Sequence, residues 1–380
     1  MFNPLDYLEN WWHNTSQSLK TWISGDKEET LQEENLTKLP PELLQHLTKV
    51  VKDLPTPPTQ QEALQTALEE ALEKWQEYPD NYANSLVVLT TPVESLSLLF
   101  QQSLQKWQAQ NSTPLKFLPW TKRPYDFGQI PEKLQSHLSQ ETATTEEGKG
   151  EIVIIPNLSW CFLRGVEGLD GIDYLRDIVL KDRSRFWLIG AHHISWQYLD
   201  YVDKIGAYFD QTFSLPDLTE EDLQTWLAPV IKEAEIGFSS NLEKEDNETA
   251  QQRYFRRLTT RSRGISSVAT QLFLNSLSYE VINPDSEEEE KKIKGENPYL
   301  PDLPNLSHNQ HYLLFSLLLH GAITLPHLAY SLGDDENLVQ HLVQVLSRSG
   351  VIKRQGASFK VDPIHYPRLR DDLDGNNFLI

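Results

Sequence analysis

Short, fully apolar segments alternate with helical patterns through the middle of the chain. Uninterrupted apolar runs stand at 86–89, 152–155 and 186–189, and apolar residues spaced three or four apart follow each run. Two further strands are predicted at 115–120 and near 208–213. Strands that are apolar on both faces belong to parallel sheets that helices cover on both sides. The sequence therefore predicts an α/β domain with a five-stranded parallel sheet.

The pattern becomes mostly helical after Leu218. Thr219 is a predicted N-cap followed by acidic first-turn residues, and one long helical stretch is predicted over 249–280. The acidic run at 287–290 and the prolines after it predict a solvated linker. Five parts result: a Trp-rich segment with an acidic linker at 1–40, an α/β domain at 41–216, a helical lid at 217–283, an acidic and proline-containing linker at 284–306, and a C-terminal domain at 307–380.

The C-terminal part has its own order of elements. Helices are predicted over 311–319 and 325–332, a third begins at Asp334 and ends before Gly350, and a hairpin follows over 351–361. Three helices followed by a two-stranded wing indicate a winged-helix domain. Such domains often bind DNA through the third helix.

The charges of this part disfavour DNA. The third helix opens on Asp334, Asp335 and Glu336, and acids at that end oppose contact with phosphates. The basic group on the wing consists of Lys353, Arg354 and Lys360. A DNA-binding regulator therefore stays an alternative, and protein contact is the preferred function.

Composition excludes several classes of protein. The 380 residues carry 55 Asp and Glu against 34 Lys and Arg, a net charge of −21, so the chain as a whole repels nucleic acid. The lone cysteine, Cys161, excludes a disulfide framework and fits a reducing compartment. With no long apolar run and no basic-then-apolar amino terminus, neither a transmembrane helix nor a signal peptide is expected. The expected location is cytoplasmic, with recruitment to a membrane or larger complex as an alternative.

The strand, Thr90-Thr91-Pro92 and helix at 86–104 resemble the first strand, phosphate loop and first helix of AAA+/STAND-type P-loop ATPases. The segments 152–157 and 186–193 resemble the Walker B and sensor-1 strands of that class, and 213–226 resembles the step into its helical lid. The stretch around Arg263 resembles its sensor-2 region. The resemblance implies a P-loop-NTPase-like sheet with a helical lid and a C-terminal winged helix. It also implies a nucleotide cleft at Thr90, Thr91, Pro92, Ser95, Ser97, Asn157, His192 and Arg263.

The residues that hold ATP in that class are missing. A P-loop needs glycines whose neighbouring N–H groups wrap phosphate, a lysine for its charge and a hydroxyl for Mg²⁺. The loop at 90–97 has neither glycine nor lysine, and Glu94 adds negative charge. Pro156-Asn157 stands where the metal-binding carboxylate belongs. Hydrolysis, a catalytic residue, a metal site and a cofactor are therefore not expected. Residual nucleotide binding at the helix start after Pro92 stays an alternative.

Two other groups are candidates for binding a partner. Trp11, Trp12 and Trp22 lie on the apolar side of an amphipathic pattern at 4–24, which predicts a helix that packs on its own domain or docks on a protein or a membrane surface. Arg256 and Arg257 could bind an acidic partner or form local ion pairs.

The leading hypothesis is a catalytically inactive ATPase-like protein that acts as a protein-interaction, scaffold or regulatory module. The alternatives are a winged-helix transcriptional regulator and a nucleotide sensor that binds without hydrolysis. The sequence leaves the oligomeric state open.

Overall fold

The computed structural model describes residues 37–78, 83–139, 150–209, 211–238, 249–282 and 290–379. The chain forms two compact units, and each unit takes two separate stretches of sequence. One unit comprises Met1–Thr59 and Asp217–Pro301, and the other comprises Gln60–Pro216 and Asp302–Ile380. The tryptophans predicted to form a docking surface, Trp11, Trp12 and Trp22, lie outside the described residues.

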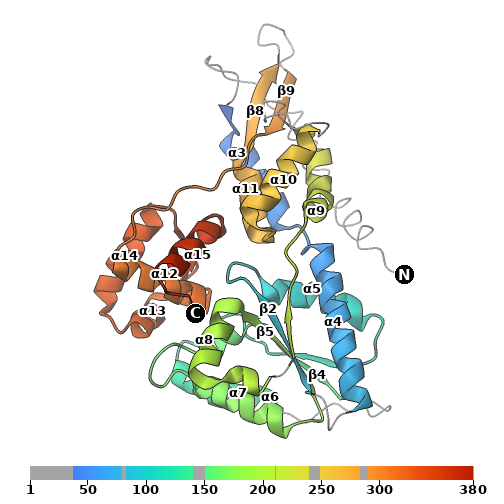
Figure 1. The fold of residues 1–380 in the computed structure, drawn as a ribbon, viewed down its shortest axis with the longest axis vertical. Helices are drawn as coiled ribbons and strands as arrows, with labels where there is room; N and C mark the ends of the chain where they lie inside the picture. Colours follow the sequence, from blue (N-terminus) through green and yellow to red (C-terminus); the bar gives the residue numbers. More distant parts are fainter. Residues whose placement is uncertain are drawn as a thin grey trace. The chain divides into compact units, whose positions relative to one another are not determined.

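The larger unit contains a five-stranded parallel sheet in the order β3-β4-β5-β2-β6 (Figure 1). Its strands are β2 (Ser85–Thr90), β3 (Leu115–Phe117), β4 (Ile152–Ile155), β5 (Phe186–His192) and β6 (Thr212–Ser214). The predicted α/β class and the parallel sheet are confirmed. The sequence predicts the fifth strand near 208–213. In the structure this strand is β6, which covers only Thr212–Ser214 and follows the short 3-10 turn η3 (Ile205–Ala207).

Helices cover both faces of this sheet (Figure 1). They are α4 (Pro58–Glu77), α5 (Leu96–Gln108), α6 (Ile130–Leu138), α7 (Asp170–Lys181) and α8 (His193–Asp203), with the 3-10 turns η1 (Phe127–Gln129) and η2 (Leu158–Trp160). Alternate strand residues, among them Leu86, Val88, Phe186 and Leu188, pack with α4 and α5 in one apolar core. The strand residues between them face the opposite side, where α6, α7 and α8 lie. Helix α6 is absent from the sequence prediction.

The connections of the sheet create a switch point between β2 and β5. These strands are neighbours, and Thr90 pairs with His192 at their carboxyl ends. The chain leaves β2 through α5 on one face and leaves β5 through α8 on the other, as right-handed crossovers in opposite directions require. Open α/β sheets bind ligands at the point where neighbouring strands diverge in this way. This edge is therefore where a ligand is sought first.

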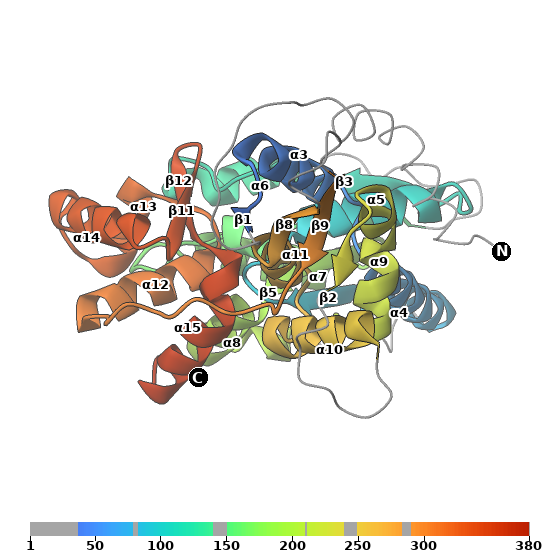
Figure 2. The same ribbon diagram turned by 90° about the horizontal axis from the view of Figure 1, so that it is seen from above.

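The C-terminal domain belongs to the same unit as the parallel sheet. Its elements are α12 (His308–His320), β10 (Ile323–Thr324), α13 (Leu325–Leu332), α14 (Glu336–Arg348), β11 (Ile352–Gln355), β12 (Ser358–Val361), η4 (Pro363–His365) and α15 (Tyr366–Gly375). The expected three helices and hairpin are present, and β10 extends the hairpin to a sheet in the order β10-β12-β11. Helix α12 lies against η2 of the α/β domain. It also lies against α8, which Figure 2 shows beside it.

The smaller unit joins helices to a four-stranded sheet in the order β1-β8-β9-β7. Its elements are β1 (Thr37–Lys38), α3 (Pro41–Lys52), α9 (Glu220–Glu233), β7 (Gly237–Phe238), α10 (Ala250–Ser262), α11 (Ser266–Asn275), β8 (Leu277–Ile282) and β9 (Glu290–Gly295). Thr219 caps α9 as expected: its hydroxyl accepts from Asp222 N, and the Asp222 carboxylate accepts from Thr219 N at 2.8 Å. Helix α3, which the sequence places at the start of the α/β domain, lies in this unit instead.

The predicted helix over 249–280 is wrong in two places. It breaks at Arg263 and Gly264, which have φ angles of 57° and 70°, and its second half gives way to β8. A Cβ atom on Gly264 would lie 2.6 Å from the backbone of Leu218, so the break brings two segments into close contact. The predicted linker at 284–306 contains β9, which pairs antiparallel with β8.

Candidate functional site

The loop after β2 lies at the switch point without the features of a phosphate cradle. Thr90 is buried at the end of the strand, and a turn follows in which Glu94 N donates to Thr91 O at 3.2 Å. Ser95 is the N-cap of α5, but its side chain makes no capping hydrogen bond, and Ser97 is half-buried in the first turn. The Thr91 hydroxyl is buried without a hydrogen-bond partner in the described part of the chain. The loop therefore presents hydroxyls and one carboxylate, but no cation.

Two candidates from neighbouring strands meet beside this loop. Asn157 follows β4, and its Nδ2 lies 3.5 Å from Nε2 of His192 at the end of β5. Asn157 Oδ1 accepts from Ser159 N at 2.9 Å and so caps η2. Burial lowers the pKa of His192 to about 4, and a hydrogen bond with the Thr91 backbone opposes part of that effect. A neutral imidazole and an amide supply neither charge for a phosphate nor a carboxylate for Mg²⁺.

The end of α12 covers His192. Gly321 follows α12 directly, and a Cβ atom built on it would lie 3.5 Å from His192 Nε2. The positive φ of Gly321, 68°, suits glycine at this close approach. The chain's own C-terminal domain thus occupies the surface above the carboxyl end of β5.

A buried arginine that the sequence analysis missed joins the two domains. Arg123 lies between β3 and η1; its Nε donates to Phe162 O at 2.8 Å, and its Nη2 donates to Ser159 O at 2.5 Å. Nη2 also lies 3.0 Å from Nδ1 of His320 on α12. Burial lowers the pKa of Arg123 to about 9. No carboxylate among the described residues pairs with this guanidinium, which is uncommon for a buried charge.

Histidines of the C-terminal domain complete this contact. His320 is fully buried, and its Nε2 lies 3.3 Å from Arg164 N and 3.4 Å from Ser331 Oγ. His327 on α13 places Nε2 2.7 Å from Tyr125 O of the α/β domain. Burial lowers the pKa of both histidines, with Arg123 adding to the effect. Arg123, Arg164, His320 and His327 are called the Arg–His seam below. No motif marks these residues in the sequence.

The arginine candidates of the lid lie in the smaller unit, whereas Thr91 and His192 lie in the larger one. Arg263 is exposed at the C-cap of α10, where its backbone N–H donates to Thr259 O. Arg256 and Arg257 are half-buried on α10.

The basic residues of the hairpin formed by β11 and β12, the predicted wing, take part in local contacts. Lys353 Nζ lies 2.6 Å from Oδ2 of Asp362, a carboxylate that is 8% exposed. Arg354 Nε donates to Gly356 O at 2.8 Å within the turn, and Lys360 is half-buried. Lys353 and Arg354 are thus engaged within the domain.

The outer face of α14 is apolar along part of its length. Leu338 and Val345 are 44% and 38% exposed, and Leu342 is half-buried between them at helical spacing. The acidic residues that open the helix, Asp335 and Glu336, are exposed beside this stripe. The stripe and the acids match a protein partner better than a phosphate backbone.

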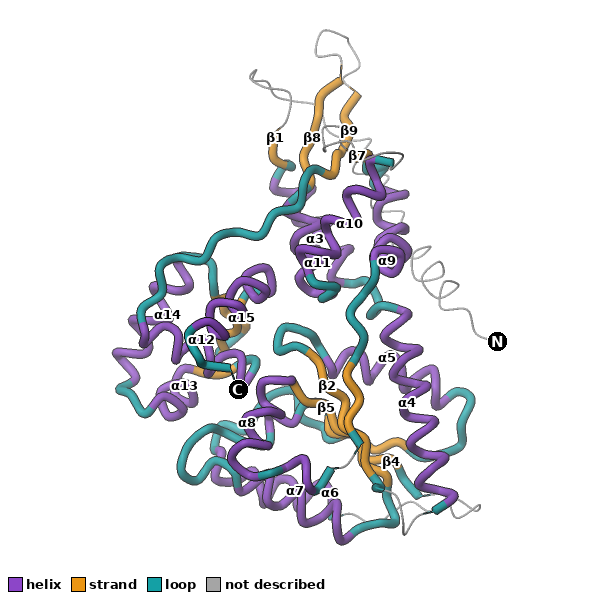
Figure 3. The backbone as a smooth tube through the Cα atoms, viewed as in Figure 1, coloured by secondary structure: helices purple, strands orange, loops and turns teal. Residues whose placement is uncertain are grey.

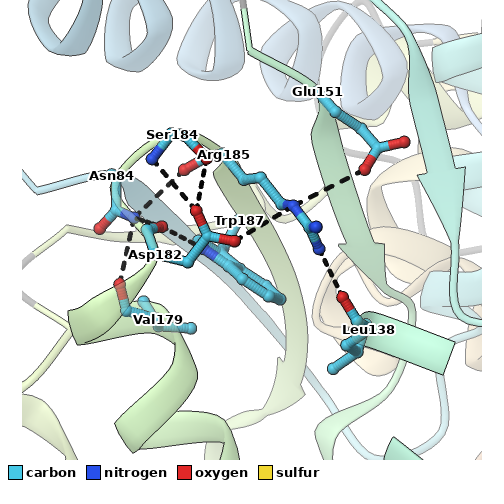
Figure 4. Close-up of polar contacts among 8 residues, drawn as sticks. All are labelled: Asn84, Leu138, Glu151, Val179, Asp182, Ser184, Arg185 and Trp187. Carbon is cyan, nitrogen blue, oxygen red and sulfur yellow. Dashed lines mark hydrogen bonds and ion pairs between the residues drawn. The ribbon is translucent and has the colours of Figure 1, made fainter. Parts of the chain in front are cut away.

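A second polar cluster lies at the opposite edge of the sheet (Figure 4). Arg185 is buried between the carboxylates of Asp182, 3.2 Å away, and Glu151, 3.9 Å away, and it donates to Leu138 O at 2.6 Å. Asn84 Nδ2 donates to Val179 O in α7 and to Asp182 O and Arg185 O in the segment between α7 and β5. These partners are structural, since they fix where the strands begin. Within the described residues, no group of three or more His, Cys, Asp or Glu side chains could hold a metal ion, and no helix is long and apolar enough to cross a membrane.

Neither a protein-family model nor a curated protein sequence matches this chain. Solved structures do match: the RuvB Holliday junction branch migration motor of Thermotoga maritima has 15% identity and a TM-score of 0.33, with 81% of this chain and 94% of RuvB covered. Cdc6p from Pyrobaculum aerophilum has 12% identity and a TM-score of 0.35, covering 90% and 100%. The Aeropyrum pernix ORC2 protein has 9% identity and a TM-score of 0.33, covering 83% and 92%. Identities and TM-scores this low transfer no activity to the chain.

Proposed function

We propose that this chain is a catalytically inactive ATPase-like protein that acts through protein contacts, as a scaffold or regulatory module. The observation that carries the proposal is the contact between the C-terminal domain and the switch point. Gly321 of that domain lies against His192, whose Nε2 is 3.5 Å from Asn157 Nδ2 at the edge where such a sheet binds its ligand.

The chemistry of this edge also opposes nucleotide binding. A triphosphate with Mg²⁺ needs cations or bundled N–H groups for its charge and a carboxylate for its metal. Here the loop carries Glu94, the strand end carries Asn157, and burial keeps His192 neutral. A nucleotide sensor is therefore the weaker alternative, and the residues described at this edge include no candidate for hydrolysis.

The proposed contact surface is the outer face of α14 in a winged-helix domain. Leu338 and Val345 are exposed there, while Lys353 on the wing is paired with Asp362. A DNA reader needs free cations around its third helix, whereas a protein partner can cover exposed apolar side chains. These features favour protein over DNA as the partner.

The test compares the full chain with a Leu338→Glu, Val345→Glu double variant as bait for cross-linking in extracts of the native host. Leu180→Glu on α7 is the matched control, because Leu180 is also 44% exposed. We expect specific cross-linked proteins that the double variant loses and the control keeps. Salt-dependent DNA binding weakened by Lys353→Ala and Arg354→Ala, with no protein lost from the α14 variant, contradicts the proposal.

A further inference from the structure

We infer that the C-terminal domain stays docked on the α/β domain only while His320 is neutral. Acidification, which protonates His320, then releases the domain. The inference rests on the Arg–His seam and goes beyond the proposed function, because it concerns how the two domains of one unit stay together.

Donors face both ring nitrogens of His320. Arg123 Nη2, which only donates, lies 3.0 Å from Nδ1, and the Arg164 backbone N–H donates to Nε2 at 3.3 Å. The neutral ring keeps one nitrogen that can accept from these donors. The protonated ring carries a hydrogen on both nitrogens, so it can accept from neither donor, and it adds a second positive charge beside the guanidinium.

The surroundings of His320 offer no compensation for a positive charge. The charged groups that act on it in the described part of the chain are Arg123 and Arg164 from the α/β domain and His327 from α13, and all three disfavour the protonated ring. Two neutral groups interact with the arginines of the seam, Cys161 with Arg123 and Tyr198 of α8 with Arg164. Burial raises the pKa of the Cys161 thiol to about 12, and burial also raises the pKa of Tyr198. A proton would therefore add a cation to a buried site that already holds one.

Proton linkage converts this arrangement into a pH-dependent contact. In the docked state, burial holds the pKa of His320 well below 6.5, and burial also lowers that of His327. Once the domain is released, both imidazoles return to ordinary values near 6.5. Release then takes up protons below pH 6.5. The free energy of docking is therefore at its full value above that pH and becomes less favourable as the pH falls. The equilibrium constant for release increases up to about tenfold per pH unit for each histidine.

The covalent connection permits such a release. The C-terminal domain follows β9 through an irregular segment over 296–307, and the chain between the α/β domain and this segment belongs to the smaller unit (Figure 3). The hold on the α/β domain is therefore non-covalent. It consists of α12 on α8 and η2, the seam, and ring contacts such as Phe127 with Tyr330 at 4.5 Å.

The experiment measures docking by energy transfer in the full chain. Exposed Ser136 on α6 and Ser347 on α14 become labelled cysteines in a Cys161→Ala background. Transfer is followed from pH 8 to pH 5. We expect it to fall below pH 6.5, with the release constant increasing at least about tenfold between pH 6.5 and pH 5.

His320→Asn separates the seam from general acid effects. Asparagine Oδ1 can accept from Arg123 as Nδ1 of the neutral ring can, but the amide does not titrate. We expect this variant to keep its transfer to lower pH, while His341→Asn on the exposed face of α14 behaves like the parent. Constant transfer down to pH 5 in the parent, or an identical loss in His320→Asn, overturns the inference.

A measurement on the unsubstituted chain guards against a variant that folds poorly. Amide exchange of α12, corrected for the intrinsic effect of pH, is compared at pH 7.5 and pH 5.5. Faster corrected exchange at pH 5.5 in α12 and in the facing surface of α8 supports release. Equal protection at the two pH values contradicts it.

Discussion

Replacing Asn84 by alanine tests whether one buried amide organises the amino-terminal edge of the sheet. Asn84 is 6% exposed at the start of β2, and its Nδ2 donates to Val179 O at 3.2 Å, Asp182 O at 3.0 Å and Arg185 O at 3.1 Å (Figure 4). One side chain thereby holds the end of α7, the turn after it and the start of β5. Alanine leaves these carbonyls with no donor from this position.

The expected loss follows from the number of bonds. Two N–H groups serve three acceptors, so about two net hydrogen bonds are lost, each worth roughly 0.5–1.5 kcal/mol, and a buried carbonyl without a partner costs about 1–3 kcal/mol. We expect Asn84→Ala to lower the free energy of unfolding by about 2–4 kcal/mol. Asn111→Ala is the control: this half-buried side chain donates once, to Trp107 O at 2.9 Å, and its loss should cost about 1 kcal/mol or less.

Urea unfolding monitored by tryptophan fluorescence measures both variants. Trp187 reports on this edge directly, because its Nε1 donates to Asp182 O at 3.4 Å. The slope of free energy against urea should stay unchanged, since neither variant alters the exposed area greatly. A loss below about 1 kcal/mol for Asn84→Ala, or one equal to that of the control, refutes the reasoning.

Three further predictions address other parts of the molecule. Gly264→Ala should destabilise the smaller unit by about 2 kcal/mol or more in thermal unfolding, because the new Cβ would lie 2.6 Å from the Leu218 backbone. Gly333→Ala is the control: Gly333 also has a positive φ but faces open space, so this change should cost only about 1 kcal/mol. Lys353→Ala removes the partner of the buried Asp362 carboxylate and should lower stability by about 1–2 kcal/mol at pH 7 without changing retention on DNA. In denaturant titrations the free energy of unfolding should be constant from about pH 6.5 to about pH 8 and should fall below pH 6.5. Burial lowers the folded-state pKa of four histidines, so below pH 6.5 the unfolded chain binds more protons than the folded chain. These are His192, His320, His327 and His365.

The parts of the fold that depend on local pattern follow from the sequence. Short uninterrupted apolar runs such as Ile152–Ile155 are typical of central strands, and the C-terminal helices are bounded by glycines and acidic caps. Strand β9 differs: the residues Glu290–Gly295 are polar except for Ile293, and they form a strand because they pair with β8. Tertiary pairing of this kind overrides local propensity.

The candidate site also contains residues that local pattern predicts and residues that only tertiary packing brings together. Asn157 and His192 follow apolar parallel strands, so their places at one edge could be predicted, and they lie 3.5 Å apart. Arg123 and His320 are 197 residues apart and belong to no motif. Their contact depends on how the C-terminal domain packs on α8, which no periodicity in either segment encodes.

Isothermal titration calorimetry with ATP and ADP, with and without Mg²⁺, tests the central claim most directly, because His192 and Asn157 at the switch point offer neither a cation for phosphate nor a carboxylate for Mg²⁺. The full chain should show no binding heat, no thermal stabilisation at millimolar nucleotide and no phosphate release. Saturable binding, or Mg²⁺-dependent phosphate release that Ser95→Ala or Arg263→Ala abolishes, would show that the cleft still works and would contradict the account.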